Sequence, residues 1–152
     1  MKQHKFFERI IPVTSLVCRL ALGFLFFYAG VGKIIAPQEF AVAIYNYQLL
    51  PDGAINLLAV VLPWLEVLLA AALVAGFYVR GASLLSAALF FVFAVALSIN
   101  LIRGLDISCG CFSAAGESIN WLYVVRDAGL LALSVFVLFF DRGWRCLAGP
   151  SA

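Results

Sequence analysis

The chain has 152 residues, of which 65% are hydrophobic and only 12% are charged. An ordinary soluble domain is about 45–50% apolar and about 25% charged, so a soluble fold of this length would lack the polar surface to cover itself. The composition therefore indicates an integral membrane protein, which we expect to form a single membrane domain over residues 1–152. The net charge of +2 is small and the basic residues form no run, which argues against nucleic acid as a partner.

Four apolar segments reach the length of about 20 residues that a helix needs to cross a bilayer. They cover approximately residues 15–36, 55–76, 80–103 and 121–140. The first is longer than the apolar region of a signal peptide, so we interpret it as a retained span. A fifth segment, approximately 38–48, has helical spacing of its large side chains and predicts a short helix in the membrane interface. The expected fold is an all-α integral membrane bundle of four helices.

The basic residues predict how this bundle is oriented, because they accumulate on the cytoplasmic side. One side of the membrane would hold Lys2, Lys5, Arg9, Arg80, Arg142 and Arg145. The opposite side would hold only Lys33 and Arg103. We therefore expect both termini in the cytoplasm and the connection between the third and fourth spans on the periplasmic or exterior side. The predicted location is the inner membrane of a bacterium, with the lipid bilayer around the four spans.

Several polar residues fall inside the spans, where charged groups are rare and usually face the bundle interior. In the first span, one helical face combines Arg19, Gly23, Phe26, Gly30 and Lys33, and its two glycines would allow close helix approach. Glu66 lies in the middle of the second span, so it must be protonated or paired, and a basic residue of the first or fourth span is its natural partner.

The half of the bundle toward the periplasm collects most of the remaining polar groups. They are Lys33, Asn100, Arg103, Arg126 and Asp127. Lys33 and Arg103 stand at helix ends, where long basic side chains usually extend toward the interface. Arg126 and Asp127 are neighbours on a helix and point about 100° apart, so we expect them to pair with other helices and not with each other. A purely structural polar network is the alternative interpretation of this group.

Cys109 and Cys111 are the clearest chemical signal, and they flank Gly110 in the periplasmic connection. A disulfide between them closes a very small ring, which needs the backbone freedom of glycine. Strained disulfides of this kind are the labile, catalytic or regulatory ones, and neighbouring cations raise the thiolate fraction of a thiol. The pair predicts redox function, with a structural disulfide or a soft-metal site as alternatives. No third metal ligand is evident, so no metal site is predicted.

The other cysteines and the only histidine limit the possible chemistry. Cys18 and Cys146 are expected toward the cytoplasm as bystanders, and the connection between the first and second spans has no cysteine. A second outer dithiol for internal electron relay is therefore missing, so the redox partner should be another molecule. His4 lies outside the spans, which argues against Ser–His and Cys–His nucleophilic schemes.

Six short blocks in order along the chain carry a resemblance to a known family. They are CRLALG at 18–23, AGVGK at 29–33, YQLLP at 47–51, LPWLE at 62–66, CGCF at 109–112 and VRD at 125–127. Their combination resembles the MauE/DoxX-like membrane proteins. Two positions depart from the family pattern, since Ser113 stands where the family usually has Gly and Asp127 where MauE-type proteins often have Asn.

The resemblance implies a four-helix membrane protein tied to periplasmic thiol–disulfide chemistry. In this family, MauE is associated with maturation of methylamine dehydrogenase, a disulfide-rich enzyme, beside a thioredoxin-like partner. DoxX-like relatives are linked to sulfur or thiosulfate metabolism and to oxidative stress.

The leading hypothesis is a membrane thiol–disulfide redox protein, a possible oxidoreductase, in which Cys109 and Cys111 cycle between dithiol and disulfide. They would exchange electrons with a periplasmic thioredoxin-like protein or a disulfide-containing client, with a membrane quinone as a further candidate acceptor. Lys33, Arg103 and Arg126 would favour a thiolate or an anionic quinone, while Asn100, Asp127 and Glu66 would orient groups or carry protons. The alternatives are a non-enzymatic assembly factor for a periplasmic enzyme and a carrier of a small molecule or metal.

Overall fold

The computed structural model describes residues 2–104 and 121–141, and every element within them is an α-helix. The helices are α1 (Lys2–Ile35), α2 (Pro37–Asn46), α3 (Asp52–Ala75), α4 (Val79–Ile102) and α5 (Trp121–Phe140). Four stretches within them are long and apolar enough to cross a membrane: Val13–Ile35, Gly53–Ala75, Val79–Ile102 and Trp121–Phe140. The predicted all-α membrane bundle is confirmed, and the chain is a multi-pass membrane protein. Cys109, Cys111 and Cys146 lie outside the described residues.

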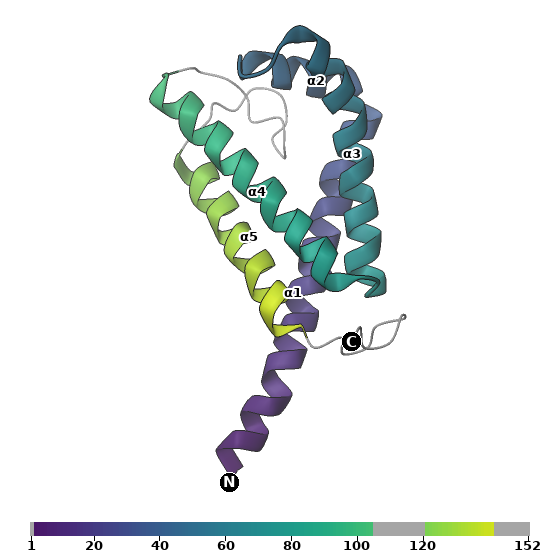
Figure 1. Ribbon diagram of the computed structural model, residues 1–152, viewed down its shortest axis with the longest axis vertical. Coiled ribbons are helices and arrows are strands. Elements are labelled where there is room, and N and C mark those ends of the chain that lie inside the picture. Colours follow the sequence, from purple (N-terminus) through teal and green to yellow (C-terminus); the bar gives the residue numbers. More distant parts are fainter. Residues whose placement is uncertain (1, 105–120, 142–152) are drawn as a thin grey trace.

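The four long helices form two pairs (Figure 1). α1 packs most extensively against α3, and α4 packs most extensively against α5, whereas contacts between the pairs are sparser. The pairs meet closely at the end where α5 finishes, which we call the narrow end. They diverge toward the end where α1 and α4 finish and α5 begins, which we call the wide end. The short helix α2 lies at the wide end against α3.

Close packing of α1 on α3 depends on two glycines of the face predicted from the sequence. A side chain at Gly23 would clash with Val74, and one at Gly30 would meet the carbonyl oxygen of Pro63 at 2.9 Å. Arg19, Phe26 and Lys33 on the same face are buried. The predicted interior face of the first span is thereby confirmed, because small residues at an interface let two helix backbones approach.

A tight turn joins α3 to α4, as the short connection between these spans predicts. Gly76 ends α3 in the left-handed region at φ 72°, and its N–H donates to the carbonyl of Ala72. Tyr78 follows, also left-handed at φ 49°. The turn makes α3 and α4 antiparallel, but each of them has its main packing partner elsewhere. The short connection therefore predicts that α3 and α4 run in opposite directions. It does not predict which helix each of them packs against.

An ion pair joins the two helix pairs at the narrow end. Arg19 of α1 donates to the carboxylate of Asp141, which follows the last residue of α5, across 3.4 Å, and both side chains are buried. Nearby, the core cluster includes Leu22, Leu73 and Val137. Above it the rings of Phe26 and Phe90 meet with centroids 5.0 Å apart, which links α1 to α4. The narrow end is therefore held by both charge and apolar packing.

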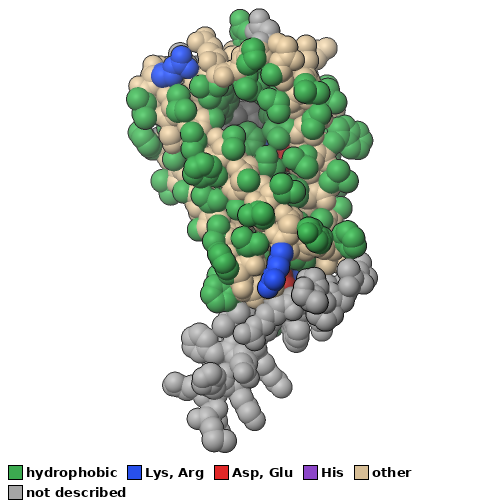
Figure 2. All heavy atoms as spheres, in the orientation of Figure 1, with side chains coloured by type: hydrophobic (Ala, Val, Ile, Leu, Met, Phe, Trp, Pro, Cys, Tyr) green, Lys and Arg blue, Asp and Glu red, His purple; other side chains and the backbone are tan. Residues whose placement is uncertain are grey.

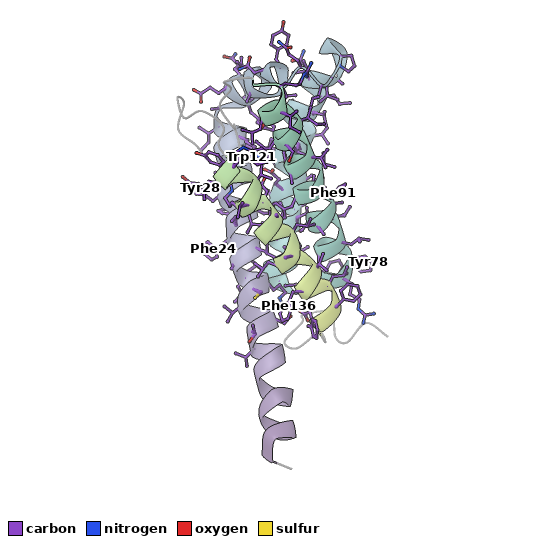
Figure 3. All side chains as sticks on the ribbon, turned by 90° about the vertical axis from the view of Figure 1, so that its left-hand side faces the viewer. Phe24, Tyr28, Tyr78, Phe91, Trp121 and Phe136 are labelled. Atoms are coloured by element: carbon purple, nitrogen blue, oxygen red, sulfur yellow. The ribbon has the colours of Figure 1, made fainter. Side chains whose placement is uncertain are left out.

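The outer surface of the bundle is apolar, as a lipid environment requires. Figure 2 shows one face covered mostly by hydrophobic side chains, with basic side chains near its two ends. Phe24, Tyr28 and Phe91 are exposed and project away from the bundle (Figure 3). Trp121 and Tyr78 are exposed at the two ends of the spans. Aromatic residues at both ends are typical of the two membrane interfaces.

Candidate functional site

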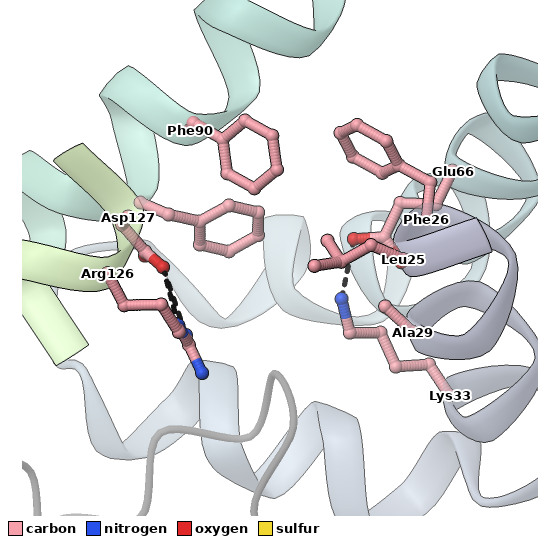
Figure 4. Close-up of a pocket in the computed structure, with 9 residues that line it drawn as sticks. Leu25, Phe26, Ala29, Lys33, Glu66, Phe90, Arg126 and Asp127 are labelled. Carbon is pink, nitrogen blue, oxygen red and sulfur yellow. Dashed lines mark hydrogen bonds and ion pairs between the residues drawn. The ribbon is translucent and has the colours of Figure 1, made fainter. Parts of the chain in front are cut away.

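A pocket toward the wide end brings charged residues of three helices together between the two helix pairs. Lys33 comes from α1, Glu66 from α3, and Arg126 and Asp127 from α5. The remaining lining residues are apolar: Leu25, Phe26, Ala29, Phe90 and Phe93. Figure 4 shows the charged side chains in two ion pairs on opposite walls, directed toward the same space. Of the six supporting residues predicted from sequence, the pocket collects these four.

Lys33 and Glu66 form the first ion pair. The Lys33 Nζ lies 2.5 Å from Glu66 Oε1, and the two residues are 5% and 2% exposed. The prediction that Glu66 pairs with a basic residue of the first or fourth span is confirmed. Extension of Lys33 toward the interface, the usual behaviour at a helix end, does not occur, because a buried carboxylate one helix away offers the ammonium a partner inside the bundle.

Arg126 and Asp127 form the second ion pair, and here the sequence-based prediction was wrong. The Arg126 Nε and Nη2 donate to Asp127 Oδ1 at 3.1 and 3.0 Å. The two Cβ atoms diverge on the helix, but the arginine side chain is long enough to turn back onto its neighbour. The facing carboxylate of Glu66 is already bonded to Lys33, so the adjacent Asp127 is the acceptor that Arg126 uses.

Aromatic rings surround the cations of the pocket. The Lys33 ammonium lies 4.8 Å from the ring centre of Phe40 on α2 and 5.5 Å from that of Phe93 on α4. The Arg126 guanidinium lies 5.1 Å from the ring centre of Tyr123. Such cation–π contacts stabilise a charge where little water is present. Sequence reasoning did not predict these contacts, because the spacing within one helix does not show which side chains of another helix lie opposite it.

Asn100 and Arg103 are not among the residues lining the pocket. Asn100 is fully buried in α4, and its Nδ2 donates to the carbonyl of Ala96 at 2.9 Å. Arg103 caps the end of α4 and is exposed. Cys109 and Cys111 lie outside the described residues, so the proposal for them rests on the sequence.

Asp141 is a buried charged residue that sequence reasoning missed. It follows the last span, where an acidic residue is expected to meet water. A signal was nevertheless present: Asp127 and Asp141 are 14 residues apart, as are Arg19 and Lys33, and this is close to four helical turns. Equal spacing places each set on one helix face, so two helices running in opposite directions can match acid to base at two levels.

The pocket is small in this conformation. Its cavity volume is about 20 Å³, which gives room for about one water molecule and not for a quinone ring. Within residues 2–104 and 121–141, no three histidine, cysteine or acidic residues gather as potential metal ligands. The arrangement can hold a polar atom between two ion pairs, and it can exchange hydrogen bonds or a proton with that atom.

Comparison with known proteins finds one family over most of the chain. The family model described as Methylamine utilisation protein MauE matches residues 11–140. A Methylamine utilization protein MauE of Paracoccus denitrificans is 37% identical over 130 residues, which cover 84% of this chain and 70% of the relative. The protein of the same name from Methylorubrum extorquens is 35% identical over 143 residues, covering 93% and 74%. No solved structure matches.

Proposed function

The chain belongs to the Methylamine utilisation protein MauE family, and from this premise we propose that it is a membrane thiol–disulfide redox protein that serves methylamine utilisation. Cys109 and Cys111 alternate between dithiol and disulfide. Their partner is a thioredoxin-like protein, or a client with its own disulfide, on the periplasmic side of a bacterial inner membrane. The resemblance of the CGCF block to the family supports this assignment of the cysteines.

The observation that carries the proposal is the position of the two cysteines in the chain, in the connection between α4 and α5 at the wide end. Cys109 follows the end of α4 by seven residues and Cys111 precedes α5 by ten. Since an extended chain spans at most about 3.6 Å per residue, Cys109 stays within about 25 Å of Ile102. Lys33 and Arg126 are each paired with a carboxylate, so the exposed Arg103 at the end of α4 is the cation that would favour a thiolate over a thiol.

The proposed exchange conserves atoms and electrons. A thiolate of the partner attacks one sulfur of the Cys109–Cys111 disulfide, and a mixed disulfide forms as the other cysteine leaves as a thiolate. The second thiolate of the partner then attacks the mixed disulfide. The partner departs with a disulfide, and the chain retains a dithiol. The reverse sequence reduces a partner, and the direction follows the relative reduction potentials.

Trapping of the mixed disulfide tests this function. A Cys111→Ser variant lacks the second thiol that resolves the mixed disulfide, so we expect a covalent adduct between Cys109 and a periplasmic protein. If Cys111 is the cysteine that the partner attacks, the adduct should form in Cys109→Ser instead. The adduct should disappear on reduction and in the Cys109→Ser, Cys111→Ser double variant. If neither single variant forms such an adduct, the protein does not carry out thiol–disulfide exchange.

A second function is favoured by the names of the relatives, which describe a pathway and not a reaction. In this alternative the chain is a non-enzymatic assembly factor for a periplasmic enzyme. Growth on methylamine of a Paracoccus denitrificans strain lacking its own MauE distinguishes the two. If this chain restores growth, an assembly factor should still do so without Cys109 and Cys111, whereas a redox protein should not.

A further inference from the structure

The helices α1 and α5 run antiparallel, and charged residues stand at two levels along them. The residues on α1 are basic, and those on or directly after α5 are acidic. At the narrow end, Arg19 pairs with Asp141 and connects the two helix pairs. Lys33 and Asp127 lie 14 residues from Arg19 and Asp141 along the chain, and both line the pocket toward the wide end. However, Lys33 bonds to Glu66 of its own helix pair, and Asp127 bonds to Arg126 of its own helix. Each of these two ion pairs at the wide end therefore lies within one helix pair.

Lys33 shares the pocket with two carboxylates that can accept its hydrogen bond, Glu66 and Asp127. Both Arg126 hydrogen bonds go to Asp127 Oδ1, which leaves Oδ2 as the oxygen a second cation can use. The ammonium also lies beside one ring from each side, Phe40 on α2 and Phe93 on α4.

One carboxylate oxygen of Glu66 accepts no hydrogen bond from the described residues. Its Oε1 accepts from Lys33, but Oε2 is buried and has no partner among the described residues. An unsatisfied buried carboxylate oxygen is costly, and a proton on it removes the charge that creates the cost. The adjoining pocket has room for about one water molecule, which can relay a proton from the bulk solution.

We propose that Glu66 is a proton-binding site that controls the distance between the two helix pairs at the wide end. One proton from a hydronium ion of the bulk solution binds Glu66 Oε2, which leaves a water molecule, and no electrons move. The neutral acid releases the Lys33 ammonium, which stays charged and turns to Asp127 Oδ2. Arg126 keeps Oδ1. The new contact draws α1–α3 toward α4–α5, as Arg19–Asp141 does at the narrow end.

The charged groups that line the pocket with Glu66 are all part of this mechanism. α1 contributes Lys33, and α5 contributes Arg126 and Asp127. From α2 and α4, the described neighbours of the Lys33–Glu66 pair are the rings of Phe40, Phe90 and Phe93. The inference does not depend on cysteine chemistry, so it stands or falls separately from the proposed redox function.

Distance measurement between two spin labels tests the proposal. Labels attached to unnatural amino acids at Ile35 and Ile102 leave all four cysteines in place, and both positions are exposed at the wide end. In lipid nanodiscs, acidification should shift the wild-type distribution to shorter distances by about 1–2 Å, the scale of known helix shifts. Glu66→Gln imitates the protonated acid and should give the short distance at every pH.

Asp127→Asn removes the second acceptor and should keep the long distance at every pH. Glu39→Gln, an exposed glutamate of α2 outside the pocket, should behave as the wild type. Labels at Val17 and Phe139 should report an unchanged narrow end. If Glu66→Gln fails to fold, the comparison of wild type with Asp127→Asn decides. The proposal is overturned if the wild type and Asp127→Asn give the same distance distributions at every pH. It is also overturned if a folded Glu66→Gln protein keeps the long distance.

Discussion

At the scale of single residues, the cost of a buried charge explains the Lys33–Glu66 pair. An isolated ion in a low-dielectric interior is unfavourable by several kcal/mol, and a partner with good geometry compensates most of this. The same reasoning applied to the sequence alone predicts that Glu66 has a basic partner. It fails for Arg126 and Asp127, because the choice between a neighbour and another helix depends on which distant carboxylates are already bonded.

Substitution of Lys33 should show how strongly the pair depends on both members. In Lys33→Met, Glu66 loses its cation, and we expect the free energy of unfolding to fall by about 3–5 kcal/mol. The double variant Lys33→Met, Glu66→Leu removes both charges and should recover most of that loss. Reversible unfolding in bicelles, monitored with a trapping assay, measures the free energy of unfolding of both variants. A double variant that is less stable than Lys33→Met would contradict this explanation of the pair.

At the scale of elements, glycine placement determines how closely α1 approaches α3. Gly30 faces the backbone of α3, whereas the Cβ position of Gly32 meets no atom within 4 Å. The spacing of the glycines in the sequence predicts an interior face on α1. It does not predict that α3 is the partner, because every span presents apolar residues that pack on any other span or on lipid.

The two glycines provide a matched test of this packing. Gly30→Ala places a Cβ 2.9 Å from the Pro63 carbonyl oxygen and 3.2 Å from Glu66 Cβ, so the backbone has to move. Overpacking of this kind costs about 1–3 kcal/mol of unfolding free energy. Gly32→Ala should be neutral or slightly stabilising, since alanine is favoured over glycine in a helix. Equal effects of the two substitutions would show that close approach at Gly30 is unimportant.

The ion pair at the narrow end should hold α5 to α1. Asp141→Asn removes the negative charge that Arg19 contacts, and we expect a loss of about 1.5–3 kcal/mol, the range for hydrogen bonds to charged groups. Limited proteolysis of the protein in detergent should detect the release of the end of α5. Unchanged stability and cleavage in Asp141→Asn would mean that apolar packing alone closes the narrow end.

At the scale of the whole molecule, composition and segment length suffice to predict a helical membrane bundle, because water and lipid impose those constraints along the chain. They do not predict the two pairs or their divergence at the wide end. That arrangement depends on which interior faces fit one another, and only the assembled structure contains this information. The pocket could be predicted as a polar region of the outer half, but not as two separate ion pairs.

The orientation of the molecule remains a prediction from its basic residues. With both termini in the cytoplasm, a membrane-impermeant maleimide added to intact spheroplasts should label reduced Cys109 and Cys111. It should label Cys146 only after the membrane is permeabilised. Variants with a single cysteine at position 109, 111 or 146 give the three readings separately. Labelling of Cys146 in sealed spheroplasts would reverse the orientation and place the redox pair in the reducing compartment.

The central claim is that Cys109 and Cys111 form one redox pair, and a redox titration of the purified protein tests it most directly. The protein is equilibrated in buffers of graded thiol and disulfide content, and free thiols are trapped with a reagent that adds mass. We predict that two thiols disappear together in a single transition, and that the Cys109→Ser, Cys111→Ser variant lacks this transition. If the two cysteines stay in one state from strongly reducing to strongly oxidising buffer, the claim is wrong.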